Sequence, residues 1–167
     1  AMLKAGKAAN RLGHPVVFDP VGVGGSTLRR KAARQLLKSV RFSVIRGNAS
    51  EIRTLVDGSA AHRGVDADTG CKDTTVLARQ LARSSGAVVV LTGAVDIVTD
   101  AQRTYLIKNG HPMMRSVTGA GCQLSALIGA YAAASPEKPL DSTLAAVCAM
   151  GLCGELAHSR MTQLDGN

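Results

Sequence analysis

Aromatic residues are almost absent from this chain of 167 residues, which contains no Trp, two Phe and two Tyr. Hydrophobic residues still make up 46% of the sequence, so its core is expected to be aliphatic. Such an apolar share excludes an intrinsically disordered protein, and a chain of this length can bury a substantial core. The scarcity of aromatic rings also argues against a protein that binds single-stranded nucleic acid by stacking on its bases.

Long runs of one residue type are missing too. The basic residues that give a formal net charge of +8 are scattered, which favours a protein that handles anionic ligands such as nucleotides over a nucleic-acid surface. No apolar run reaches the ~20 residues that span a membrane, and no signal peptide is evident. The four cysteines form no CxxC pair and no zinc-ligand spacing. We therefore expect a cytoplasmic protein with no nucleic-acid or membrane partner.

Strand and helix signals alternate along the chain. Short apolar runs predict strands at residues 16–18, 42–45 and 87–91, and a hairpin at 96–99 and 103–107. Helical patterns cover residues 2–12, 26–38, 50–56, 72–83, about 122–133 and about 141–159, with a connecting loop at 57–71. This order predicts one α/β domain over residues 1–167, with a mostly parallel sheet between helices. Both ends of the domain look truncated, because the first helix lacks an N-cap and no closing element follows the last.

Glycine-containing loops follow three of the expected strands and open one helix. They read DPVGVGG (19–25), RGNASE (46–51), TGAVD (92–96) and TGAGC (118–122). In open α/β sheets, ligands bind beyond the carboxyl ends of the strands, and glycine lets the backbone approach a phosphate closely. Each loop alone is explained equally well as an ordinary turn or helix cap. Four of them in the same topological position favour a phosphate-binding site.

The segments FDPVGVG, VIRGNASEI, LTGAVDIVTD, NGHPMM and VTGAGCQLSALIGAYAA resemble the hydroxyethylthiazole kinase family of the ribokinase-like superfamily. The resemblance extends over essentially the whole chain. It implies a three-layer α/β/α sandwich, ribokinase-like, whose N-terminal strands are missing here. It also implies Mg²⁺-dependent transfer of phosphate from ATP to the hydroxyl of 4-methyl-5-(2-hydroxyethyl)thiazole, for thiamine biosynthesis or salvage. The family is typically a homotrimer with active sites between subunits.

The same resemblance assigns roles to individual residues. Arg46 and Thr92 fall where the family contacts ATP phosphates, and Gly119 falls where it contacts the thiazole. Asp19 and Glu51 match the acidic residues that handle magnesium, partly through water. These residue types suit the roles, because an Arg fork pairs with phosphate oxygens and carboxylates suit a hard, hydrated Mg²⁺.

Cys122 occupies the place where most ribokinase-like relatives have their catalytic aspartate. The backbone N–H groups of Gly119, Ala120, Gly121 and Cys122 open a helix, where they are expected to form an anion hole for the transferred phosphoryl group. A helix N-terminus also favours the thiolate form of a cysteine. We therefore predict that Cys122 is the catalytic base for the substrate hydroxyl, rather than a small packing residue.

Two departures keep other functions open. Ala94 stands where the family usually has glutamate in its TGEVD motif, and the family's N-terminal portion is not in this chain. One alternative is another ribokinase-like kinase, for example for a hydroxymethylpyrimidine or a sugar, although cysteine at position 122 argues against it. The other is a catalytically inactive oligomeric remnant.

Overall fold

The computed structural model of the protein describes residues 1–58, 71–162 and 165. The α-helices are α1 (Met2–Arg11), α2 (Thr27–Ser39), α3 (Ala49–Asp57), α4 (Cys71–Ser85), α5 (Ala120–Ala134) and α6 (Pro139–Ser159). The strands are β1 (Val17–Phe18), β2 (Val44–Asn48), β3 (Val88–Thr92), β4 (Asp96–Thr99) and β5 (Thr104–Ile107). Two short 3-10 helices are η1 (Val23–Gly25) and η2 (Pro112–Ser116).

The strands form one sheet in the order β1-β2-β3-β4-β5. Strands β1, β2 and β3 run parallel, whereas β4 and β5 form the predicted antiparallel hairpin beside β3. In the register of β2 and β3, Asn48 lies opposite Thr92, so both strands end at the same level. The carboxyl ends of the three parallel strands therefore meet at one edge of the sheet, where the glycine-containing loops follow them.

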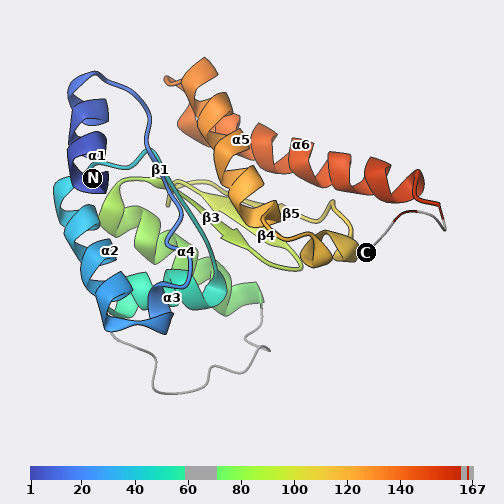
Figure 1. Cartoon of the computed structure of the whole chain (residues 1–167), viewed down its shortest axis with the longest axis horizontal. Helices are drawn as coiled ribbons and strands as arrows, with labels where there is room; N and C mark the ends of the chain where they lie inside the picture. Colours follow the sequence, from blue (N-terminus) through green and yellow to red (C-terminus); the bar gives the residue numbers. More distant parts are fainter. Residues whose placement is uncertain (59–70, 163–164, 166–167) are drawn as a thin grey trace.

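Each face of the sheet carries its own apolar core, because successive side chains of a strand point to opposite faces. On one face Ile45, Val89 and Leu91 pack with residues of α2, α3 and α4. On the other face Val44, Val88 and Val90 pack with residues of α5 and α6. Figure 1 shows these two groups of helices on opposite sides of the sheet. The predicted α/β/α sandwich is confirmed.

Helix α6 (Pro139–Ser159) differs from the expectation that no apolar segment is long enough to span a membrane. Its 21 residues make it long and apolar enough, by length and composition alone, to cross a membrane. In this fold it packs on α5 and on strands β3 to β5, and it buries Leu140, Ala146 and Val147. The core helix of a soluble protein also meets this criterion, so its length and composition alone are weak evidence that α6 spans a membrane.

Two segments expected to be loops are partly helical. The helix predicted at 72–83 begins one residue earlier, at Cys71, and the rest of the expected loop at 59–70 lies outside the described residues. The segment after Gly110 contains η2, which Pro112 begins and which the His111 side chain caps by accepting a hydrogen bond from the Met113 N–H. A proline at the first helical position and a polar cap before it are the signals that we did not use.

Candidate active site

Arg46, in the middle of β2, lies at the centre of a polar cluster near the carboxyl ends of the parallel strands. One guanidinium nitrogen, Nη1, is 3.3 Å from the Asp19 carboxylate oxygen Oδ2, and the other, Nη2, donates to Thr92 Oγ1 at 3.1 Å. Asp19 follows β1, Arg46 belongs to β2 and Thr92 ends β3. The side chains of Arg46 and Asp19 are only 14% and 15% exposed, so water screens this ion pair less than a surface pair.

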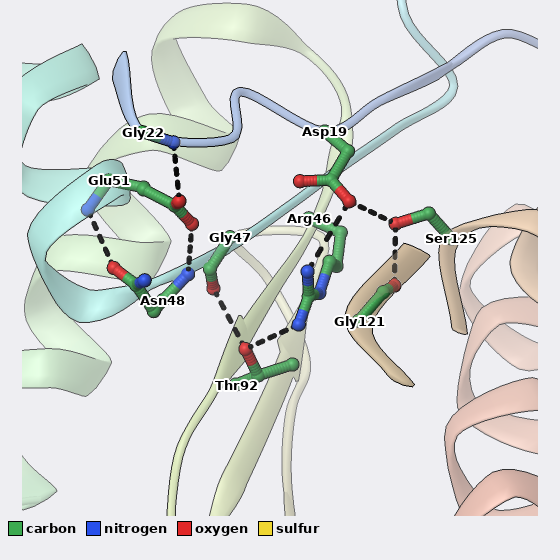
Figure 2. A network of polar contacts seen from close by, with 9 residues as sticks. All are labelled: Asp19, Gly22, Arg46, Gly47, Asn48, Glu51, Thr92, Gly121 and Ser125. Carbon is green, nitrogen blue, oxygen red and sulfur yellow. Dashed lines mark hydrogen bonds and ion pairs between the residues drawn. The ribbon is translucent and has the colours of Figure 1, made fainter. Parts of the chain in front are cut away.

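The N-terminus of α5 borders the same cluster. Ser125 in this helix donates a hydrogen bond to Asp19 Oδ2 over 2.7 Å, which Figure 2 shows beside the Arg46 pair. A Cβ added at Gly121 would lie 2.6 Å from Arg46 Nη1, so the guanidinium rests against the first turn of the helix. The loop after β1, strands β2 and β3 and one helix N-terminus, all distant in sequence, are thus brought together as the motifs predicted, although residues 46–48, expected in a loop, are the end of β2.

The first turn of α5 leaves backbone donors available. Gly119 precedes the helix with a left-handed φ of 85° and supplies no side-chain cap. The Ala120 N–H donates to the Val117 carbonyl oxygen, so this member of the predicted anion hole is already engaged. Among the described residues, the N–H groups of Gly121 and Cys122 have no acceptor. These two groups, beside a guanidinium and at the positive end of a helix, form a site suited to an anion.

Glu51 has a structural role that the sequence analysis did not include. Its Oε1 accepts from the Gly22 N–H and its Oε2 from the Asn48 N–H, each at 2.9 Å. Asn48 in turn accepts from the Glu51 N–H, which completes a capping box at the start of α3. Glu51 therefore fixes the loop after β1 to the start of α3, as the left part of Figure 2 shows.

The predicted magnesium residues differ in how well they fit a metal. Within the described ranges, no group of three or more His, Cys, Asp or Glu residues is arranged to hold a metal ion. Asp19 Oδ1 is buried and has no hydrogen-bond partner, so it is an acceptor left for a cation or a donor group of a ligand. Glu51 already accepts one hydrogen bond on each oxygen, which leaves only its remaining lone pairs for a metal or its water.

Cys122, the predicted base, is the third residue of α5 and its thiol is free and exposed. Gly119 is also exposed at the start of the helix, and so is Ala94 in the loop after β3. The thiol is therefore open to a small molecule that approaches the helix N-terminus. Cys148 and Cys153 are free and exposed on α6.

Asp96 is a polar residue of this region to which we assigned no role. Its Oδ1 accepts from the Gly93 N–H at 2.9 Å, which closes the TGAVD turn. Burial raises the pKa of the Asp96 carboxyl above its ordinary value, although that hydrogen bond and the positive charge of Arg46 both act to lower it. Ser125 was likewise missed, although it lies one helical turn after Cys122, a spacing that places both residues near the same face.

Comparison with known proteins links this geometry to a family. The profile described as "Hydroxyethylthiazole kinase family" matches residues 1–167. A hydroxyethylthiazole kinase of Clostridium acetobutylicum is 51% identical over 100% of this chain and 64% of its own length. The solved structure of a hydroxyethylthiazole kinase from Pyrococcus horikoshii OT3 is 35% identical, with a TM-score of 0.83 over 95% of this chain and 57% of that one.

A ribokinase-like superfamily protein from Enterococcus faecalis shares the fold with a TM-score of 0.61, at 17% identity over 87% of this chain and 46% of that one. The chain spans about three fifths of the length of the two hydroxyethylthiazole kinases named above. The sequence match covers the whole chain, and the loops that converge on Arg46 are the motifs on which the resemblance was based. The chain belongs to the hydroxyethylthiazole kinase family.

Proposed function

We propose that the full-length protein transfers the γ-phosphoryl group of ATP to the hydroxyl of 4-methyl-5-(2-hydroxyethyl)thiazole, in the cytoplasm, for thiamine biosynthesis or salvage. The observation that carries this proposal is the position of Arg46. Its guanidinium lies between Asp19 and Thr92 and against the first turn of α5, at the carboxyl edge of the parallel strands. Phosphoryl transfer requires charge neutralisation and alignment, and this cluster supplies both.

ATP phosphates would bind in front of Arg46. The guanidinium is a donor from β2, and the Thr92 hydroxyl would donate from β3 in place of its 3.4 Å bond to the Gly47 carbonyl oxygen. The free N–H groups of Gly121 and Cys122 are donors from the helix. Arg46 Nε is buried without a partner, so the guanidinium retains an unused donor. Donors that converge from three elements can hold a phosphoryl group while charge moves to the leaving oxygen.

The thiazole alcohol would approach the N-terminus of α5 from the exposed side, past Gly119. Cys122 would act as the base that accepts the proton of the substrate hydroxyl as its oxygen attacks the γ-phosphorus and ADP leaves. The exposure of the thiol and the proximity of free backbone donors support this role. Of the predicted anion hole we propose the N–H groups of Gly119, Gly121 and Cys122, without that of Ala120, which donates to the Val117 carbonyl oxygen.

Magnesium, when bound, would neutralise charge on the ATP phosphates. Asp19 supports such a site through its buried, unpartnered Oδ1, and Glu51 would contribute through water, since both of its oxygens already accept hydrogen bonds. We also propose a homotrimer with active sites between subunits, for which the support is membership of the family.

The test is an assay of the full-length protein with ATP, Mg²⁺ and a panel of alcohols, in which the phosphorylated product is identified by mass spectrometry. The panel contains hydroxyethylthiazole, a hydroxymethylpyrimidine, pyridoxal and a sugar. Phosphorylation of hydroxyethylthiazole in preference to the others supports the proposal. Preference for another alcohol would indicate a different ribokinase-like kinase, and ATP binding without any transfer would indicate an inactive remnant.

A further inference from the structure

Ser125 is connected to the Asp19 carboxylate across 106 residues of sequence. Its Oγ lies 2.7 Å from Asp19 Oδ2 and 3.2 Å from the Gly121 carbonyl oxygen. A hydroxyl has one proton, so it donates to one of these acceptors at a time. The bond to Asp19 is shorter and its acceptor is charged, which makes it the stronger of the two.

This bond affects how Asp19 meets Arg46. Asp19 Oδ2 accepts from both Ser125 and Arg46 Nη1, whereas Oδ1 and Arg46 Nε are buried and unpartnered. The contact is therefore one-sided and long, at 3.3 Å, although arginine and carboxylate prefer two parallel, shorter bonds. Ser125 keeps Asp19 Oδ2 turned towards α5. In this way it opposes a closed pair, in which both carboxylate oxygens of Asp19 would accept from Arg46.

A closed pair would compete with the nucleotide. A second bond to Asp19, from Nε beside Nη1, would rotate the guanidinium and so disturb the bond that Nη2 now makes to Thr92 at 3.1 Å. It would also use the donors that the phosphates need. We propose that Ser125 is a positioning residue: it holds Asp19 in the open geometry and so keeps Arg46 available to the phosphates of ATP. This inference rests on the proposed kinase function, because it assumes that Arg46 binds phosphate.

The test uses full-length protein and calorimetric titration with ATP in the presence of EDTA, so that no metal contributes. Ser125→Ala should weaken ATP binding roughly tenfold, and Ser125→Thr, which keeps the hydroxyl, should restore most of the affinity. In steady-state assays Ser125→Ala should raise the KM for ATP more than it lowers kcat. Ser142→Ala is the matched control, because Ser142 is a buried helical serine whose hydroxyl donates to the Pro139 carbonyl oxygen of its own helix.

A double-mutant cycle separates positioning from a general effect on α5. Asp19→Asn removes the charge of the ion pair, so Ser125→Ala should have no further effect on ATP affinity in that background. An equal loss in both backgrounds, or parent affinity in Ser125→Ala, would overturn the inference. If Ser125→Ala does not fold, Ser125→Cys, a weak donor, replaces it in the same cycle. Parent protein that binds no ATP would refute the proposed function itself, and this inference with it.

Discussion

Gly121 offers a direct way to move Arg46 without changing it. A Cβ at this position would lie 2.6 Å from Arg46 Nη1, 2.8 Å from Nη2 and 3.0 Å from Cζ. Ordinary contacts of a Cβ begin at about 3.4 Å, so in Gly121→Ala the guanidinium must retreat by several tenths of an ångström. The clashing atoms are the end of a flexible side chain, so we expect the side chain to move and the fold to remain.

The magnitude follows from what Arg46 would lose. Its bond to Thr92 at 3.1 Å and its contact with Asp19 at 3.3 Å hold the guanidinium in place, so a shift of that size takes it out of the position from which it would donate to a phosphate. A hydrogen bond to a charged group contributes about 1.5–3 kcal/mol, and about 1.4 kcal/mol corresponds to a tenfold change in affinity. ATP affinity should therefore fall about 10- to 100-fold. Stability should not fall in parallel, because alanine favours a helix over glycine by about 0.5–1 kcal/mol.

Calorimetric ATP titration and urea unfolding of the full-length protein measure the two effects separately. Gly129→Ala is the matched control in the same helix, because its Cβ would meet Val17 Cγ2 at an ordinary 3.8 Å. This control should gain helix stability and keep parent affinity. In an Arg46→Ala background, Gly121→Ala should have little further effect. Parent-like ATP affinity in Gly121→Ala would refute the placement of the phosphates in front of Arg46.

Two further predictions concern the neighbouring residues. Cys122→Ala should lower kcat roughly 10²- to 10⁴-fold in full-length protein and leave ATP affinity nearly unchanged, whereas Cys122→Asp should retain more activity. Parent-like turnover by both variants would show that Cys122 is not the base. Because burial raises the pKa of Asp96, the stability linked to its protonation is present below the unfolded pKa of about 3.8 and is lost as pH rises through the folded pKa. Asp96→Asn should therefore be more stable than the parent in urea near neutral pH, with the gain disappearing in acid; an equal gain at both pH values would contradict this.

The strand-end part of the site was predictable because topology determines it. Arg46 and Thr92 come from β2 and β3, and parallel neighbours bring their carboxyl ends to one edge whatever the details of packing. The glycine loops and the hairpin were predictable for a related reason: turn residues and period-2 alternation are local signals. Asp19 could be placed at the same edge, since it directly follows β1.

The contacts that set the chemistry of these residues were harder to predict. The Ser125 bond to Asp19 depends on how α5 packs against the sheet beside β1, which no local pattern specifies. The capping role of Glu51 was predictable, since Asn48 and Glu51 have the spacing of a capping box. The family resemblance led us instead to predict only a magnesium role for Glu51. The hydrogen bond from the Ala120 N–H to the Val117 carbonyl oxygen depends on the turn geometry at Val117, which no local sequence pattern specifies either.

The most direct test of the whole account is the affinity of the full-length protein for ATP with and without the Arg46 side chain. Arg103→Ala is the control, because Arg103 is an exposed arginine that pairs with Asp100 and Asp141 at the hairpin. Calorimetry should show that Arg46→Ala binds ATP about 10- to 100-fold more weakly than the parent, as expected for loss of about 1.5–3 kcal/mol, while Arg103→Ala matches the parent. A folded Arg46→Ala protein that binds ATP as tightly as the parent would contradict the account.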